Sequence, residues 1–94
     1  MQFLLYCLDK PNAAALRAQH RPAHLDYLKS HAAKISAAGP LLTDDGTGMI
    51  GSLLIFEVPD RKEVEDFAAG DPYAKAGLFQ SVTIAPWKRV LWQG

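Results

Sequence analysis

The sequence predicts one α+β domain, a ferredoxin-like βαββαβ unit whose antiparallel sheet carries its helices on one face. The first reason is size, because 94 residues suffice for a single core and we expect one domain over residues 1–94. The second is a pair of strongly apolar segments, QFLLYCL at residues 2–8 and SLLIFEV at residues 52–58, which have the composition of strands. The third is that helical periodicity follows each segment in turn, which is the element order of a split βαβ fold.

The first strand is predicted to end in the turn sequence DKPN at residues 9–12. Asn12 then caps a short alanine-rich helix, Ala13–Gln19, which Pro22 interrupts. Proline is favoured at the first position of a helix because its missing N–H is not needed there, so Pro22 is predicted to begin a second helix. The apolar face of that second helix consists of Leu25, Leu28, Ala32 and Ile35.

The middle of the chain contains the second and third strands. The dipeptide GP at residues 39–40 prevents further helix, and residues 40–43 are predicted to form a short extended segment. A glycine-rich loop, DDGTGMIG at residues 44–51, separates that segment from the apolar strand 52–58.

The last third is predicted to contain a second long helix and a final strand. Asp60 and Glu63 have the spacing of a capping box, so the helix begins there. The apolar face of this helix consists of Val64, Phe67 and Ala68, and the helix is broken at residues 70–72. A short helical turn at Tyr73–Ala76 follows. The chain ends in a last strand or pair of strands, Gln80–Ala85 and Lys88–Trp92, bent at Pro86.

The first and third strands are the most continuously apolar, which predicts that they occupy the centre of the sheet and are covered on both faces. Two helices cover only one face, and a monomer rarely exposes a large apolar patch. We therefore expect a homodimer in which two sheets pack through their open faces, because two-fold dimers are the commonest assembly.

Composition excludes several classes of function. Lys plus Arg and Asp plus Glu are both 10, so there is no basic excess for nucleic acid and no charged run for a membrane surface. The single cysteine, Cys7, fits a reducing compartment. The N-terminus has neither the basic start of a signal peptide nor the length of a membrane span, so we expect a cytoplasmic protein.

Three histidines raise the question of a metal site. His20 and His24 are four residues apart, but Pro22 lies between them and predicts that they do not share a regular helix. His24 and His31 share a helix face but lie about 10 Å apart along the axis. No HExxH motif or cysteine cluster accompanies them, so no metal ligand is predicted.

His24 and Asp71 each have a structural and a chemical interpretation. His24 is predicted near the first turn of a helix, where the helix dipole favours the neutral imidazole that a general base requires. Its structural interpretation is a partly buried histidine that donates one hydrogen bond to the backbone. Asp71 precedes Pro72 and is a natural helix cap, although a carboxylate can also orient an imidazole. From position alone the structural role is favoured for both.

Other polar residues extend the candidate site. Arg17 and Arg21 are surface charges or hold an anionic group of a substrate. Ser52 lies in no GxSxG motif and is interpreted as a hydrogen-bond donor to a ligand, and the glycine-rich loop has no phosphate-binding GxxxxGK pattern. Tyr73, Trp87 and Trp92 are most simply core or dimer-interface aromatic residues.

Over nearly its whole length the sequence resembles the YCII-related (YciI-like) family. The Arg-Pro-x-His and Asp-Pro-Tyr elements are the most specific, and the segments that carry the resemblance are DKP at 9–11, RAQHRPAHLDYL at 17–28, GPLL at 39–42, GSLLI at 51–55, GDPYAKAGLF at 70–79 and PW at 86–87. The resemblance implies a fold related to the dimeric α+β barrels. It also implies a His–Asp active-site pair at His24 and Asp71, with a serine near it in some members that corresponds to Ser52.

The resemblance favours the chemical interpretation. One branch of the family is similar to an enzyme that eliminates chloride from a chlorinated hydroxyquinol, and related barrel families isomerise lactones or bind small aromatic compounds. We therefore expect a lyase or isomerase without metal or organic cofactor, acting on a hydroxylated ring or enolisable compound. Its predicted catalytic residues are His24 and Asp71, and its predicted substrate-binding residues are Arg17, Arg21, Ser52 and Tyr73. The alternatives are a non-catalytic ligand-binding or accessory dimer, and an interaction module that uses the open sheet face.

Overall fold

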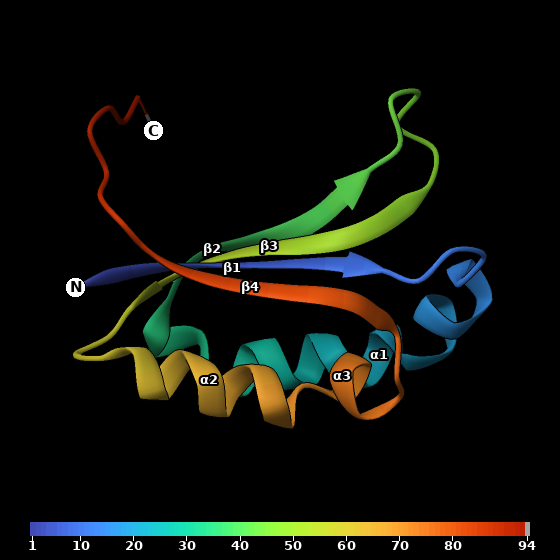
Figure 1. Ribbon diagram of the computed structural model, residues 1–94, viewed down its shortest axis with the longest axis horizontal. Coiled ribbons are helices and arrows are strands. Elements are labelled where there is room, and N and C mark those ends of the chain that lie inside the picture. Colours follow the sequence, from blue (N-terminus) through green and yellow to red (C-terminus); the bar gives the residue numbers. More distant parts are fainter. Residues whose placement is uncertain (94) are drawn as a thin grey trace.

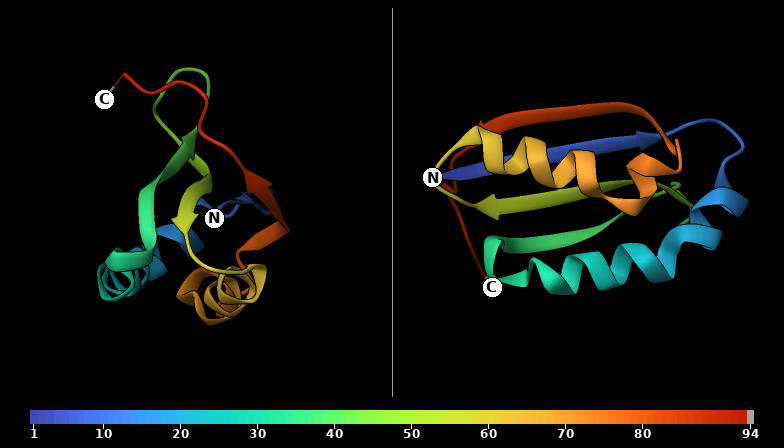
Figure 2. Two further views of the ribbon diagram at one scale, coloured as in Figure 1. Left: turned by 90° about the vertical axis from the view of Figure 1, so that its left-hand side faces the viewer. Right: turned by 90° about the horizontal axis from the view of Figure 1, so that it is seen from below.

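The computed structural model describes residues 1–93, which form a four-stranded antiparallel sheet with helices on one face (Figures 1 and 2). The elements in chain order are β1 (Gln2–Asp9), α1 (Ala14–Ser30), a 3₁₀ turn (Ala32–Lys34), β2 (Ile35–Leu42), β3 (Met49–Glu57), α2 (Arg61–Gly70), α3 (Pro72–Lys75) and β4 (Phe79–Trp87). The strand order is β2-β3-β1-β4, so the first and third strands are central. The predicted ferredoxin-like βαββαβ fold is confirmed.

The core lies between the sheet and the helices. Successive side chains of a strand point to opposite faces, and Leu5 of β1 pairs with Leu54 of β3, so both lie on the helix-covered side. α2 packs its apolar stripe against them. The buried cluster consists of Phe3, Leu5, Cys7, Leu54, Phe56, Val58, Val64 and Phe67.

The first helix differs from the prediction. α1 is continuous with Pro22 inside it, and Asn12 does not cap it, because Asn12 has a φ of 58° and the N-cap residue Ala13 makes no side-chain hydrogen bond. An interior proline costs a helix about 3 kcal/mol. The two buried residues of α1, Arg17 and His24, lie on either side of Pro22, and their polar contacts attach both halves of the helix to the rest of the fold.

The second strand is longer than predicted. The apolar periodicity predicts Ala32 and Ile35 on a helix face, but α1 ends before either, and Ile35 begins β2 by pairing with Phe56 of β3. Pro40 fits within β2 because this is an edge strand, where one side of the backbone has no partner strand. β3 also begins earlier than predicted, at Met49, so the loop before it is shorter.

The last third agrees with the prediction except at its end. Asp60 caps α2 by accepting a hydrogen bond from the Glu63 N–H at 3.2 Å. The helical structure is interrupted within the predicted residues 70–72, because α2 ends at Gly70 and α3 begins at Pro72. β4 is a single strand ending at Trp87. The predicted strand at 88–92 is wrong, because these residues leave the sheet and are paired with none of its strands.

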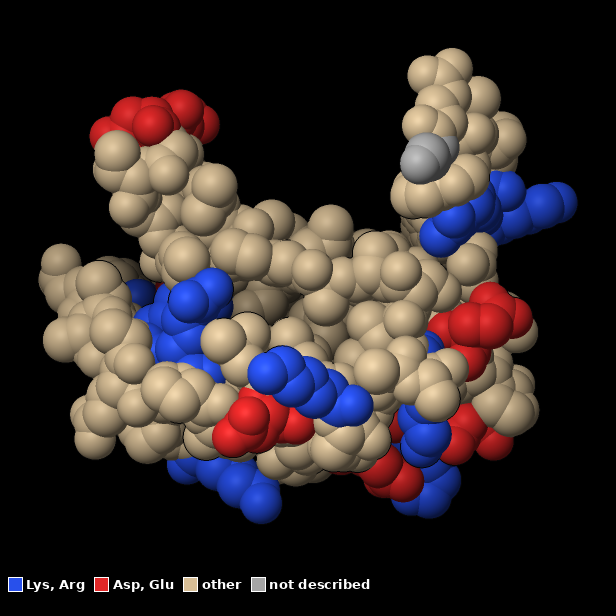
Figure 3. Space-filling view, turned by 180° about the vertical axis from the view of Figure 1, so that it is seen from behind, with Lys and Arg blue, Asp and Glu red and all other residues tan. Residues whose placement is uncertain are grey.

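The second face of the sheet carries no helix within residues 1–93 (Figure 1). Most of the side chains that line it are uncharged, including Leu4 opposite Ile55 and Tyr6 opposite Leu53, and the charged Glu57 lies at one end of it, opposite Gln2. The β2–β3 loop and the segment after β4 rise beyond this face at opposite ends and leave a trough between them (Figure 3). Its coverage by a second copy stays a prediction. None of the helices in the described chain has the length and apolar character needed to span a bilayer.

Candidate active site

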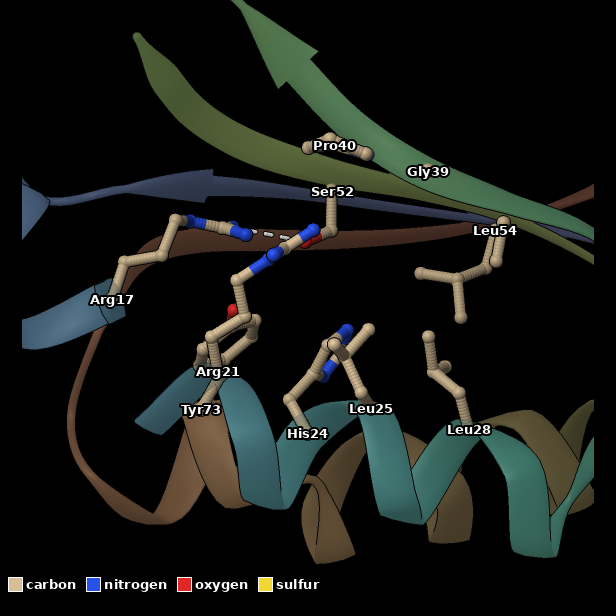
Figure 4. Close-up of a pocket in the computed structure, with 11 residues that line it drawn as sticks. Arg17, Arg21, His24, Leu25, Leu28, Gly39, Pro40, Ser52, Leu54 and Tyr73 are labelled. Atoms are coloured by element: carbon tan, nitrogen blue, oxygen red, sulfur yellow. Dashed lines mark hydrogen bonds between the residues drawn. The ribbon is translucent and has the colours of Figure 1, made fainter. Parts of the chain in front are cut away.

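A cavity of about 200 Å³ opens between α1 and the helix-facing side of the sheet near its β2 edge (Figure 4). Apolar side chains such as Leu25, Leu28 and Leu54 form one part of its wall. The polar part consists of Arg17, Arg21, His24, Ser52 and Tyr73. The fold therefore brings five of the six predicted site residues to one cavity, from α1, β3 and α3, and the sixth, Asp71, is hydrogen-bonded to His24.

His24 and Asp71 form a buried hydrogen-bonded pair. Their Nδ1 and Oδ1 atoms are 2.9 Å apart, although 47 residues separate them in the sequence, and the side chains are 8% and 3% exposed. Asp71 also caps α3, because the same Oδ1 accepts a hydrogen bond from the Tyr73 N–H at 2.9 Å. The two interpretations of Asp71 are thus compatible. The cap fixes the carboxylate at the imidazole.

This contact determines which imidazole nitrogen faces a ligand. A carboxylate accepts a hydrogen bond from Nδ1–H, which leaves the lone pair on Nε2, and the ring of His24 points from α1 into the cavity (Figure 4). The predicted place of His24 at a helix start is wrong, because it lies well inside the continuous α1. Its orientation comes from Asp71 and not from the helix dipole.

Arg17 is a buried cation held by three side-chain hydrogen bonds. Its Nε donates to Asp9 Oδ2 at 2.6 Å, and its Nη2 donates to Asp9 Oδ1 at 2.9 Å and to Ser52 Oγ at 2.9 Å. Burial alone would lower the pKa of Arg17, but the hydrogen bond and charge of Asp9 outweigh it and raise that pKa. Arg17 is therefore a fixed positive group in the cavity wall.

Asp9 also belongs to the site, although its sequence position predicts only a turn residue. It ends β1, next to an irregularity in the pairing of β1 with β4, and its side chain is 5% exposed. The available signal was an acidic residue that closes a strongly apolar strand eight residues before an arginine. Such a carboxylate needs a buried partner, and Arg17 on the following helix is the nearest cation in the sequence that α1 can bring back to the strand.

Ser52 has its hydroxyl proton available for a ligand. It lies on β3 opposite Cys7, among apolar residues that face the helices, and it is 3% exposed. Because its Oγ accepts from Arg17, its own O–H can donate toward the cavity. The predicted role as a hydrogen-bond donor is compatible with this geometry.

Tyr73 links the two buried pairs. Its ring stacks on the His24 imidazole with centroids 4.1 Å apart, and the Arg17 guanidinium carbon lies 4.5 Å from the Tyr73 centroid. Burial raises the pKa of the Tyr73 hydroxyl although Arg17 and Arg21 oppose that shift. Within residues 1–93 this buried hydroxyl has no hydrogen-bond partner.

Arg21 differs from Arg17 in exposure and pairing. It is exposed and lines the cavity, and it takes part in none of the ion pairs formed within the described chain. Arg17 is compensated by Asp9, so Arg21 supplies the uncompensated positive charge of the cavity wall.

The histidines show where the metal argument depended on a wrong helix. His20 and His24 do lie on one helix, because α1 continues through Pro22. Residues 1–93 nevertheless contain no group of three or more His, Cys, Asp or Glu side chains that could hold a metal ion. His31 lies at the far end of α1, where its ring packs against Tyr27 and Phe67.

Together, the fold and the site define a ferredoxin-like α+β protein with a small cavity, a buried His–Asp pair and a buried arginine. The chain belongs to the YCII-related family, whose domain model matches residues 1–88. The protein YciI of Escherichia coli O6:H1 is 31% identical, over 96% of this chain and 99% of that protein. An uncharacterized protein of Haemophilus influenzae is 32% identical over the same shares.

Solved structures show the same fold. The 5-chloro-2-hydroxyhydroquinone dehydrochlorinase (TftG) of Burkholderia phenoliruptrix AC1100, in complex with 2,5-dihydroxybenzoquinone, has a TM-score of 0.88 and 39% identity and covers 96% of both chains. An antibiotic biosynthesis monooxygenase has a TM-score of 0.55 at 15% identity, over 96% of this chain and 98% of that one. The second likeness concerns the fold alone.

Proposed function

We propose that this chain is a dehydrochlorinase-like lyase or isomerase that uses His24 and Asp71 as an acid–base pair on a hydroxylated ring or enolisable compound. The observation that carries the proposal is the buried 2.9 Å contact between these side chains beside a cavity that also holds Arg17 and Ser52. The 39% identity to a dehydrochlorinase over 96% of both chains supports the same reaction class.

The proton transfer follows from the tautomer. With Nδ1–H donated to Asp71, Nε2 of His24 accepts a proton from a hydroxyl or acidic C–H of the substrate, and the carboxylate stabilises the imidazolium that forms. In an elimination, the electron pair left on the substrate forms a new double bond and the leaving group departs as an anion. In an isomerisation, His24 returns the proton to a different atom. General acid–base catalysis of this kind contributes about 10²–10⁴-fold.

The charges in the cavity fit a substrate that becomes an anion. Arg17 and Asp9 neutralise each other, and after proton transfer the His24 imidazolium and the Asp71 carboxylate do the same. Arg21 then balances the negative charge on the substrate, while the Ser52 hydroxyl donates a hydrogen bond to the oxygen that carries it. Tyr73 offers its unpartnered hydroxyl as a further contact for a ligand oxygen.

We further propose that the active form is a homodimer packed through the open sheet face. That face is uncovered in the single chain, and its strand side chains are uncharged except for Glu57 at one end, which pairs with the N-terminal amine. The trough between its raised ends leaves room for a second sheet (Figure 3).

Turnover and binding separate this function from its alternative. The test measures chloride release from 5-chloro-2-hydroxyhydroquinone and conversion of a panel of hydroxylated aromatics and lactones, and measures binding of 2,5-dihydroxybenzoquinone separately. His24→Gln is expected to lower kcat by about 10²–10⁴-fold while ligand binding persists. His20→Gln, on the same helix but outside the cavity lining, is the matched control and should retain activity.

Unchanged turnover in His24→Gln would end the catalytic proposal. Binding of 2,5-dihydroxybenzoquinone by a wild-type protein that converts no compound of the panel would instead support the non-catalytic ligand-binding dimer. The uncompensated charge of Arg21 is the observation that keeps this alternative in place, because an anion-binding protein needs it as much as an enzyme does.

A further inference from the structure

A tyrosine of α1 joins this helix to the end of α2. The two helices lie side by side across the covered face of the sheet (Figure 2). The Tyr27 hydroxyl donates a hydrogen bond to the Phe67 carbonyl in the last turn of α2 at 2.9 Å. The Tyr27 ring packs against Phe67 and His31, whose ring centroids lie 4.8 and 4.4 Å away. Tyr27 therefore connects the two helices at one defined point.

Gly70 leaves the space that this contact needs. A Cβ atom at position 70 would lie 2.5 Å from the Tyr27 hydroxyl oxygen, closer than two such atoms can approach. The backbone itself does not require glycine, because residue 70 is the last of α2 and its φ is not positive. Glycine is also less favourable than alanine in a helix. The close approach of Tyr27 is thus the structural reason for glycine at position 70.

The contact lies directly beside the His24–Asp71 pair. Tyr27 follows His24 by three residues on α1, so both side chains project from the same side of the helix. Gly70 immediately precedes Asp71 in the chain. Burial, and after it the charge of Asp71, raises the pKa of Tyr27, so its hydroxyl keeps the proton that it donates. α1 and the junction of α2 with α3 are therefore connected at two adjacent points.

The second half of α1 depends on this attachment because of Pro22. Proline has no N–H, so one hydrogen bond of the α1 backbone is missing there. Arg17 attaches the half before Pro22 to β1 through Asp9, whereas His24 lies in the half after it. Among residues 1–93, that second half reaches α2 or α3 by two side-chain hydrogen bonds, one from His24 and one from Tyr27. Tyr27 is thus the support that His24 does not supply itself.

We propose that Tyr27 and Gly70 are positioning residues of the active site, which set the separation at which the His24 imidazole meets the Asp71 carboxylate. Neither residue lines the cavity, so both act through the pair and not on a ligand. Misplacement of a catalytic group by about 1 Å can cost about 10²-fold in rate. The inference rests on the proposed function for its effect on turnover, and on the geometry alone for its effect on the imidazole.

Turnover of three variants tests the positioning role, with chloride release from 5-chloro-2-hydroxyhydroquinone or conversion of the panel as the assay. Gly70→Ala should lower kcat by about 10²-fold, because the new Cβ displaces the Tyr27 hydroxyl, and Tyr27→Phe should lower it by about tenfold. KM should stay within about twofold of wild type, because the cavity lining is unchanged. The double variant Y27F/G70A should be as active as Tyr27→Phe, because the nearest ring atom would lie 3.3 Å from the Cβ.

A proton resonance reports on the same contact without a substrate. An Nδ1–H proton bonded to a buried carboxylate resonates downfield of the backbone amides, and His24→Gln assigns it by its loss. The resonance should weaken or move upfield in Gly70→Ala and return in Y27F/G70A. A merely structural role would lower stability but leave the resonance of the folded variant in place. Tyr6→Phe is the matched control, because Tyr6 lies on the open face of the sheet and should change neither measurement.

A His24 resonance that stays in place in both single variants would overturn the positioning role, and so would a double variant no more active than Gly70→Ala. Circular dichroism shows whether each variant is folded. If Gly70→Ala does not fold, Tyr27→Phe decides, since a kcat and a resonance equal to those of wild type would exclude the role. Turnover retained in His24→Gln would instead overturn the proposed function, and the resonance would still show whether Tyr27 and Gly70 position the imidazole.

Discussion

Replacing Asp9 by alanine would remove the partner charge of the buried Arg17. Both side chains are 5% exposed, and two hydrogen bonds join them at 2.6 and 2.9 Å. Loss of one partner of a buried ion pair costs about 3–5 kcal/mol, because the other charge stays in a poorly solvated place. A domain of this kind has about 5–15 kcal/mol of stability in total, so Asp9→Ala should remove a large share of it.

The same reasoning predicts that substitutions of Asp9 and Arg17 are not additive in their effect on stability. Arg17→Met should also destabilise, because it leaves the Asp9 carboxylate buried without its cation. The double variant D9A/R17M removes both charges and should cost less than the sum of the single changes. Urea unfolding followed by tryptophan fluorescence measures the free energies. The protein concentration must be held fixed, because a dimer that unfolds to monomers is stabilised by concentration.

The result that would refute this reasoning is a small effect. If Asp9→Ala changed the free energy of unfolding by less than about 1 kcal/mol with an unaltered m-value, the pair would be behaving as a solvent-exposed salt bridge. Arg17 would then be mobile enough to find water, and its proposed part in holding Ser52 for a substrate would fail with it.

Two further predictions concern the core and the second helix. The Cys7 thiol should not react with a disulfide reagent at pH 8 in the native protein and should react quickly in denaturant, because burial and then the charge of Asp71 raise its pKa to about 12. Gly70→Ala should lower stability by about 1–3 kcal/mol in urea unfolding, because the new Cβ would lie 2.5 Å from the Tyr27 hydroxyl, which donates to the Phe67 carbonyl. Adding Tyr27→Phe should recover part of that loss, and no recovery would show that the hydroxyl is not the obstacle.

The arrangement of strands could be predicted because it depends on patterns that the sequence states directly. β1 and β3 are apolar at nearly every position, and only a central strand covered on both sides requires this. The continuous α1 could not be predicted. Local preference places a helix break at Pro22, and the contacts that outweigh that preference, from Arg17 to Ser52 and from His24 to Asp71, join residues 35 and 47 positions apart.

The candidate site, like the fold, could be predicted from the sequence only in part. The types of its residues suggested their chemistry, but spacing gave no reason to bring His24 to Asp71, and only the family resemblance placed them together. Asp9 stayed unassigned because a turn accounts for an aspartate at the end of a strand, and its partner Arg17 becomes visible only when α1 folds back on β1. Long-range polar contacts of this kind are consequences of topology, which a local pattern does not contain.

The distribution of buried polar groups gives an argument for a functional cavity that does not depend on any relative. Among residues 1–93, the buried polar or charged residues are Arg17, His24, Ser52 and Asp71. Three of them line one cavity and the fourth is bonded to it. Burying such groups costs more than burying apolar side chains of similar size, and a fold of this kind does not need an arginine or a histidine in its core. A requirement for stability alone would place apolar residues at these positions, as in the rest of the core, where phenylalanine, leucine and valine predominate. The polar groups gathered at one cavity therefore indicate a site selected for what it binds.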